Sequence, residues 1–228
     1  MCHLCCATMV RLLFSILALV ILTQAQIERK GPCPDLPVME NFQPTEYTGI
    51  WYEYEKYPAS FQSNPSICSF ANYTLKPKRR IDVVNKALNK LTGKYSAAHG
   101  EAYAPDQDEP SKLLVKFDRS PAPPGPYWVL DTDYENYSIV YNCKNKPGNT
   151  TRLEIVWILA RKSQGPGAQL VVEAEGLLIR LGVSTRFFRK SNQTGCASTS
   201  SGGDNINGQL FGIICMFVIL LILGQSPH

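Results

Sequence analysis

Eight short segments in which apolar and polar residues alternate constrain the fold of this 228-residue chain more than any other feature. Alternation with a period of two is typical of β-strands, and clusters of Gly, Pro and Asn separate the segments. Closing such a sheet removes its edges, and eight strands are just wide enough to enclose one small ligand. The sequence therefore predicts an all-β, antiparallel, up-and-down barrel. Its expected strands are 49–57, 68–75, 81–89, 95–104, 112–117, 127–132, 137–141 and 152–161.

One helix is expected after the barrel. Gly165-Pro166-Gly167 breaks the chain, and apolar residues then recur at helical spacing up to Gly182. This stripe favours a C-terminal α-helix packed outside the barrel over a membrane or partner helix. We expect a short final strand at 184–188.

The first 25 residues are typical of a signal peptide. Arg11 precedes an apolar run over 12–22, and Thr23-Gln24-Ala25 is a small-residue cleavage pattern. A mature chain starting at Gln26 would have its folded domain at 26–197. This is the size of one domain with a substantial core.

The C-terminal region has the order of a signal for a glycosylphosphatidylinositol (GPI) anchor. Small residues and a polar spacer occupy 198–209, and a hydrophobic tail at 210–228 would be removed on anchoring. The apolar part of this tail, 210–223, is shorter than the ~20 residues of a membrane-spanning helix. We expect attachment near Ser200, on the extracellular side of the plasma membrane. A retained tail anchor and secretion without an anchor are the alternatives.

Few features of the expected domain suggest catalysis. Of three histidines only His99 remains after processing, so neither a metal cage nor a Ser-His-Asp triad can be assembled. Asp131 and Asp133 are interpreted as solvated or capping carboxylates. The net charge of +4 has one tight basic cluster, Lys78-Arg79-Arg80, which is expected in a turn. We predict no enzyme, no cofactor, no metal and no nucleic-acid partner.

Four of the eight cysteines remain in the expected domain. An even number in a secreted chain predicts two disulfides, and spacing alone does not choose among the three pairings. Zinc is the rival interpretation, but no Cys-x-x-Cys spacing remains. The four residues are Cys33, Cys68, Cys143 and Cys196.

Three ordered motifs carry a family resemblance. They are Gly49-Ile50-Trp51, Thr132-Asp133-Tyr134 and a strand that ends in Arg161. Together they resemble the lipocalin family. Ala71-Asn72-Tyr73 and the stretch from Tyr127 to Cys143 resemble its branch of apolipoprotein D and insect Lazarillo. The resemblance covers 33–196.

The resemblance implies roles for particular residues. Trp51 would close the narrow end of the barrel beneath Arg161. Cys33 would pair with Cys143, and Cys68 with Cys196. Tyr73 and Trp157 are expected to contact ligand. Trp128 is added as a third contact from the phase of its own strand, 127–132.

Four sequons, Asn-x-Ser/Thr, predict a glycoprotein with exposed acceptors. Asn72 aligns with a residue that is glycosylated in the family. The expected acceptors are Asn72, Asn136, Asn149 and Asn192.

The predicted function is the carriage of a small hydrophobic ligand, such as a fatty acid, sterol, retinoid or hydrocarbon, in the barrel cavity. The alternative is an anchored recognition glycoprotein, with a role in neuronal guidance or adhesion, whose barrel is a scaffold for a cell-surface receptor. Bulky side chains meeting at the centre of the barrel would favour the scaffold.

Overall fold

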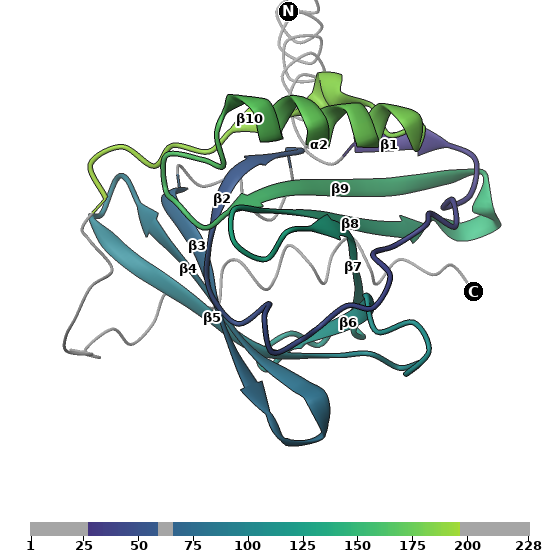
Figure 1. Ribbon diagram of the computed structural model, residues 1–228, viewed down its shortest axis with the longest axis horizontal. Helices are drawn as coiled ribbons and strands as arrows, with labels where there is room; N and C mark the ends of the chain where they lie inside the picture. Colours follow the sequence, from purple (N-terminus) through teal and green to yellow (C-terminus); the bar gives the residue numbers. More distant parts are fainter. Residues whose placement is uncertain (1–26, 59–65, 197–228) are drawn as a thin grey trace, which may run out of the picture.

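Eight antiparallel strands close into a barrel in the computed structural model, which describes residues 27–58 and 66–196 (Figure 1). Each strand pairs with the next along the chain, and the last returns to the first, with Ala160 opposite Tyr52. The predicted up-and-down barrel is therefore confirmed. Its strands are β2 (Gly49–Lys56), β3 (Ser66–Lys76), β4 (Arg80–Asn89), β5 (Lys94–Tyr103), β6 (Lys112–Phe117), β7 (Gly125–Thr132), β8 (Tyr137–Asn145) and β9 (Thr151–Ala160).

The expected signal peptide and the whole C-terminal region from residue 198, with Ser200, lie outside the described residues. Within the described part, single turns of 3₁₀ helix connect two strand pairs. They are η2 (Pro77–Arg79), which holds most of the basic cluster, and η3 (Pro147–Asn149).

Two short strands extend the sheet beyond the barrel. β1 (Ile27–Lys30) pairs with β9, and β10 (Arg189–Lys190) pairs with β2. The expected strand at 184–188 is wrong, because the 3₁₀ turn η4 (Thr185–Phe187) occupies this segment. Phe187 and Phe188 instead place their rings 5.6 and 5.2 Å from that of Tyr57. Aromatic burial against the barrel wall thus takes the place of strand pairing.

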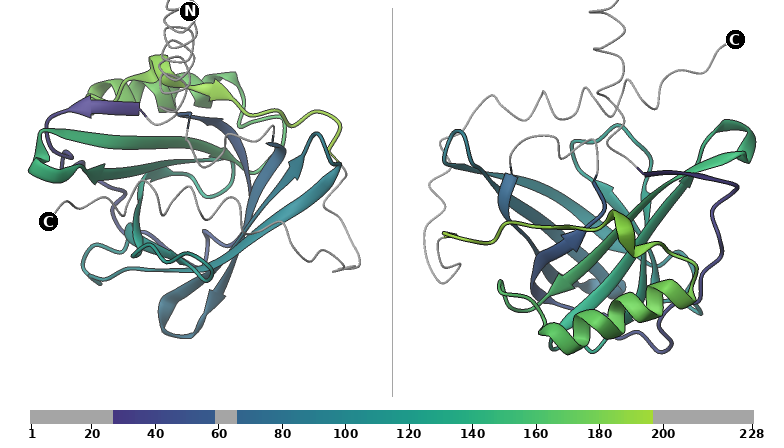
Figure 2. Two further views of the ribbon diagram at one scale, coloured as in Figure 1. Left: turned by 180° about the vertical axis from the view of Figure 1, so that it is seen from behind. Right: turned by 90° about the horizontal axis from the view of Figure 1, so that it is seen from above.

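Apolar side chains form two separate clusters. The inner cluster fills part of the barrel, and the outer cluster lies between α2 (Ala168–Arg180) and the outer faces of β8 and β9. Because side chains alternate along a strand, β9 contributes to both. Trp157 and Leu159 belong to the inner cluster, and Val156 and Ile158 to the outer. Figure 2 shows α2 against the outside of the barrel, as predicted.

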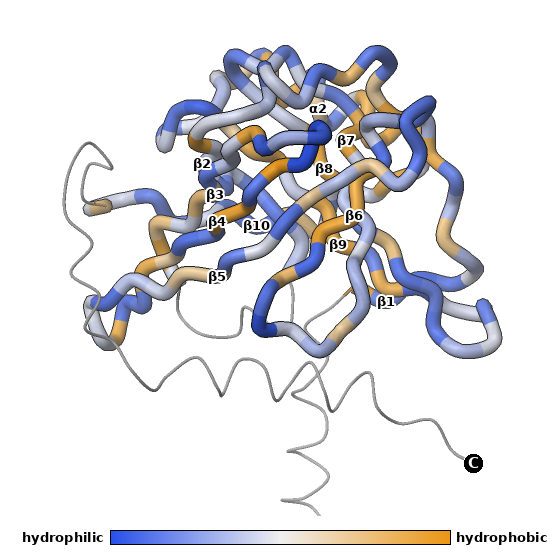
Figure 3. The backbone as a smooth tube through the Cα atoms, turned by 90° about the horizontal axis from the view of Figure 1, so that it is seen from below, coloured by the Kyte–Doolittle hydropathy of each residue, from blue (hydrophilic) through white to orange (hydrophobic). Residues whose placement is uncertain are grey.

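Hydropathy follows this arrangement along the backbone. In Figure 3 the apolar residues lie on the strands, and the connecting turns are largely hydrophilic.

Two disulfides fasten the segments that flank the barrel. They join Cys33 to Cys143 and Cys68 to Cys196, the pairs that the resemblance implies.

Candidate functional site

One end of the barrel is covered by the chain that precedes β2. Phe42 and Tyr47 are buried in the inner cluster, and the Trp51 indole donates a hydrogen bond to the Tyr47 carbonyl oxygen at 2.9 Å. Gly49 has a φ of +91°, and a Cβ there would lie 3.3 Å from the Arg161 guanidinium. The Gly-x-Trp motif therefore lets the chain turn closely beneath an arginine.

Arg161 fastens this covered end. Its guanidinium carbon lies 3.8 Å from the centroid of the Trp51 ring, a cation–π contact. Its nitrogens donate four hydrogen bonds of 2.8 to 3.0 Å to backbone carbonyl oxygens. The acceptors belong to Glu46, Thr48, Ile50 and Tyr134. Trp51 and Arg161 are thus engaged with each other and the backbone.

Thr132, Asp133 and Tyr134 form a turn that supports the same end. Thr132 Oγ1 donates to the Tyr137 carbonyl at 2.6 Å and accepts from the Tyr134 amide at 2.9 Å. Burial acts to raise the pKa of Asp133, but hydrogen bonds from Asn136 and from three backbone amides outweigh it, and the pKa lies below its ordinary value. This carboxylate caps a turn.

The barrel interior is open at the other end, and β5 shows this most clearly. Near the covered end Gly100 and Ala102 are buried and alternate with the half-buried Glu101 and Tyr103, as expected of a strand with one packed face. Over the rest of the strand, from Lys94 to His99, every residue is exposed. Ala98 and Ser96 share the inward face of Ala102. From Lys94 to His99 β5 pairs with β4 but not with β6, so the inward face of Ser96 and Ala98 is accessible to solvent at this end of the barrel.

Hydrogen-bonded tyrosines form the floor of this open interior. The Tyr127 hydroxyl lies 3.0 Å from that of Tyr73 and 3.1 Å from that of Tyr47, which lies 2.8 Å from Ser138 Oγ. Burial raises the pKa of Tyr47 to about 12, and burial also raises the pKa values of Tyr73 and Tyr127. The floor is therefore polar but uncharged.

The two tryptophans expected at the ligand lie on opposite sides of the wall. Trp157 packs against the inner cluster and is half-buried, so part of its ring remains accessible. Trp128 belongs to the outer cluster, where its ring lies 6.3 Å from that of Tyr141 and 4.9 Å from Lys112 Nζ. Trp128 therefore does not belong to the expected ligand site.

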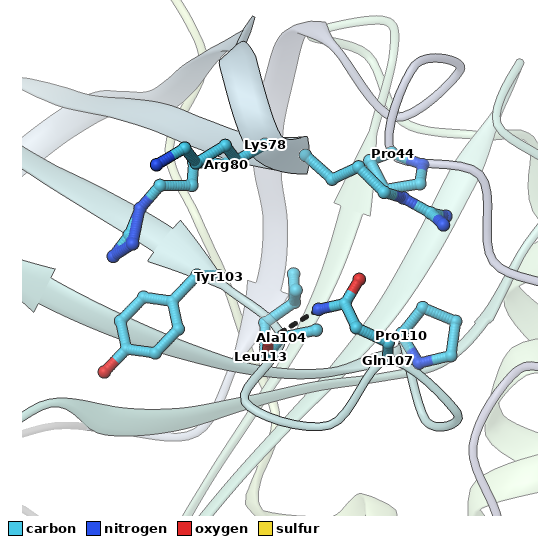
Figure 4. A pocket seen from close by; sticks show the side chains of 9 residues that line it. Pro44, Lys78, Arg80, Tyr103, Ala104, Gln107, Pro110 and Leu113 are labelled. Carbon is cyan, nitrogen blue, oxygen red and sulfur yellow. Dashed lines mark hydrogen bonds between the residues drawn. The ribbon is translucent and has the colours of Figure 1, made fainter.

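A separate hollow of about 170 Å³ lies outside the covered end, between the β3–β4 and β5–β6 connections (Figure 4). The Arg80 guanidinium lies 4.6 Å from the Tyr103 ring centroid and pairs with Glu101, and Gln107 donates to the Ala104 carbonyl. None of the expected ligand residues lines this hollow.

The sequons differ in their surroundings. Asn72, Asn149 and Asn192 are exposed. Asn136 is half-buried, and its side-chain nitrogen donates to Asp133 Oδ2 at 2.8 Å. Since an attached glycan would occupy that nitrogen, Asn136 is the least suitable acceptor.

Within residues 27–58 and 66–196, no group of three His, Cys, Asp or Glu side chains is placed to hold a metal ion. No helix of this part of the chain has the length and apolar character needed to span a membrane. His99 is exposed on β5.

A closed eight-stranded barrel with one covered and one open end, and a helix on its outer wall, has the architecture of a ligand-binding calyx. The chain belongs to the lipocalin family, since residues 43–175 match the family model of the lipocalin-like domain.

Curated proteins and solved structures agree with this assignment. Apolipoprotein D of Rattus norvegicus is 42% identical over 165 residues, 70% of this chain and 82% of that protein. Lazarillo protein of Schistocerca americana is 30% identical over 191 residues, 83% of this chain and 87% of that protein. The structure of insecticyanin from Manduca sexta superposes with a TM-score of 0.66 at 25% identity, covering 75% of this chain and 90% of the other. The chain is thus similar to both proteins of the branch that its motifs resemble.

Proposed function

We propose that this lipocalin binds and carries one small hydrophobic ligand in the open half of its barrel. The observation that carries the proposal is the loss of burial along β5, where the inward-facing Ser96 and Ala98 are exposed. An inward face that is solvent-accessible and lined by small side chains leaves room for a ligand. Bulky side chains meeting there would instead have favoured a scaffold.

The surroundings of this space suit an apolar molecule. Trp157 and Tyr73 present aromatic surface toward the interior, and aliphatic side chains of the inner cluster surround them. Pockets of this kind are mainly apolar with a few polar groups, and buried apolar area supplies ~25 cal/mol per Å² before the costs of association. These residues support binding of the ligand and not its chemical conversion.

A tryptophan pair tests the proposal. An apolar ligand such as a retinoid should quench the fluorescence of the protein, and Trp157→Ala should abolish most of the quenching and weaken binding about tenfold or more. Trp128→Phe is the matched control, since Trp128 lies on the outer face, and it should leave the affinity unchanged. Wild-type affinity in the Trp157→Ala variant would show that the ligand lies elsewhere.

We further propose that the protein acts on the extracellular side of the plasma membrane. The two disulfides fit the oxidising secretory pathway, and the three exposed sequons fit a glycoprotein. The residues from 198 onward carry the order of a GPI-anchor signal, with attachment proposed near Ser200.

A surface recognition role is the second candidate, favoured by the similarity to Lazarillo protein along 83% of this chain. In that case the glycans and open-end loops would contact a receptor. A Trp157→Ala variant that loses ligand but keeps binding to cells would assign the recognition role to the surface.

A further inference from the structure

Two cations at the tip of the β3–β4 hairpin have no carboxylate partner among residues 27–58 and 66–196. The cations that flank the tip, Lys76 and Arg80, pair with carboxylates at 2.6 and 2.9 Å. Lys78 and Arg79 lie between them, are exposed, and form no ion pair in this part of the chain. The hairpin therefore carries two uncompensated positive charges at its tip.

The backbone at this tip is strained. The φ angle is +62° at Lys78 and +55° at Arg79, so both residues lie in the left-handed region. A side chain with a Cβ is destabilised in this region, whereas Gly, and to a lesser degree Asn, adopt it readily. Asn-Gly is therefore the usual pair where two successive turn residues need a positive φ. A Lys-Arg pair keeps two charges here in spite of the strain, which indicates that the charges have a use.

Both cations line the hollow of about 170 Å³ outside the covered end of the barrel. Figure 4 shows the cationic side of this hollow across from Tyr103, Gln107 and Pro110. Pro44 and Leu113, which also line the hollow, are buried and give it an apolar floor. Because a cavity of about 150 Å³ is enough to hold benzene, the hollow has room for one small ring.

The charge at the hollow is positive. Among the described residues that line it, none is acidic. The third cation, Arg80, is balanced by Glu101, and its guanidinium lies 4.6 Å from the centroid of the Tyr103 ring. Asp106 and Asp108 of the β5–β6 connection do not line the hollow, and the Asp106 carboxylate accepts from the Asp108 amide at 2.9 Å. Three cations and the one carboxylate that pairs with Arg80 thus leave two positive charges.

We propose that this hollow binds a compact organic phosphate monoester, whose phosphate contacts Lys78 and Arg79 and whose apolar group rests on the floor of Pro44 and Leu113. A phosphate monoester carries about two negative charges at neutral pH, which match the two unpaired cations. A guanidinium binds two phosphate oxygens at once, and the lysine adds a point charge. The site lies outside the barrel, so it goes beyond the carrier function and does not depend on it.

Four small probes test the site by calorimetric titration of the full-length mature protein. They are phenyl phosphate, phenyl sulfate with a single charge, inorganic phosphate without an apolar group, and benzyl alcohol without a charge. Wild type at pH 7.5 should bind phenyl phosphate about tenfold more tightly than inorganic phosphate or benzyl alcohol, and about fivefold more tightly than phenyl sulfate. Added salt should weaken the binding of phenyl phosphate, because the two cations are exposed.

A double variant separates binding from stability. Lys78→Asn with Arg79→Gly removes both charges and suits the positive φ angles, so it should weaken phenyl phosphate about tenfold or more and keep or raise the midpoint of urea unfolding. Lys90→Asn with Lys94→Gln is the matched control, because it removes the same charge from the β4–β5 turn at the open end and should keep the affinity. Arg79→Gln alone repeats the test if the double variant does not fold.

Several outcomes would overturn the proposal. Equal affinity of wild type for phenyl phosphate and benzyl alcohol, or full affinity in the charge-free tip variants, would show that the two cations hold no anion. Inorganic phosphate that binds as tightly as phenyl phosphate would rule out the apolar floor, and phenyl sulfate that does so would rule out the match of two charges. Displacement of phenyl phosphate by a retinoid, or its loss in Trp157→Ala, would place the anion in the barrel instead.

Discussion

Arg161 illustrates how a single residue ties the covered end together. Its four carbonyl acceptors come from the chain before β2, from β2 itself and from the β7–β8 turn, while its flat face lies on Trp51. A guanidinium can serve all of these contacts because its donors lie in one plane and its faces stack on aromatic rings. The geometry of the guanidinium therefore explains why an arginine directly follows β9.

Arg161→Ala should destabilise the protein by about 3 kcal/mol, because four backbone carbonyls lose their donor and Trp51 loses its stacked cation. Arg161→Lys should recover less than half of this loss, since an ammonium cannot reach the same acceptors. Urea unfolding followed by Trp fluorescence measures both values. Full stability of the lysine variant would show that charge alone suffices.

The tyrosine floor predicts a pH dependence of stability. Burial raises the pKa of Tyr47 to about 12 from an ordinary value of 10, so the folded protein keeps a neutral phenol where the unfolded chain ionises. Its contribution is complete below pH 10 and is lost as the pH rises from 10 toward 12, by about 1.4 kcal/mol per pH unit. Urea unfolding at pH 9 and pH 11 tests this sign.

Tyr73→Phe is the informative variant, because burial also raises the pKa of Tyr73. Removing that hydroxyl should make the difference in stability between pH 9 and pH 11 smaller. An unchanged difference would mean that other groups cause the alkaline loss.

At the scale of elements, the sequence predicts strands well where one face is packed. All eight barrel strands follow from alternation and turn residues, with shifts of a few residues at their ends. The sequence does not indicate which face of β7 points into the barrel, because α2 covers the outer wall and both faces of β7 and β8 are apolar. Alternation then no longer distinguishes inside from outside. This is why Trp128 is misplaced by the sequence although the strand is correct.

The short outer strands and the hollow at the β3–β4 turn show a second limit. β1 and β10 together contain a single apolar residue, Ile27, so no hydrophobic pattern marks them, and only pairing with β9 and β2 makes them strands. The basic cluster is correctly expected in a turn, but the sequence does not indicate the hollow, because its other walls come from Pro44 and from residues 103–113.

The Cys68–Cys196 disulfide adds a covalent bond to a C-terminal segment that β-pairing holds only briefly. β10 pairs with β2 through two residues, and residues 191–193 add hydrogen bonds to Glu53, Tyr54, Cys68 and Ser69. Replacing both cysteines by alanine should cost about 2 to 4 kcal/mol and make the peptide bonds after Arg189 and Lys190 sensitive to trypsin.

Limited proteolysis with mass spectrometry reads out this release. The matched control replaces Cys33 and Cys143, which should expose the N-terminal arm, residues 27–48, and leave the C-terminal segment protected. Equal protection of residues 189–196 with and without the Cys68–Cys196 bond would show that the hydrogen bonds alone retain it.

At the scale of the whole molecule, the covered end and the open end differ in how firmly they are held together. The covered end is fastened by Arg161, the capped turn and the N-terminal arm, whereas the open half of β5 retains exposure on both faces. Such a division would let the proposed ligand space stay unfilled without loss of the fold. What the barrel can do with a ligand then depends on whether it is tethered, because an anchored carrier captures or delivers at one membrane.

The proposed anchor predicts that phosphatidylinositol-specific phospholipase C releases the full glycoprotein from intact cells. Replacing the small residues around Ser200 by bulky ones should abolish this release, because transamidation requires small residues at and after the attachment site. Peptide mapping of the released protein with chymotrypsin should recover sequence up to the attachment site and none from 210–228. Retention on the cell after treatment, with peptides from 210–228 present, would instead indicate a tail that stays in the membrane. Appearance in the medium without enzyme would indicate a free carrier that moves between cells.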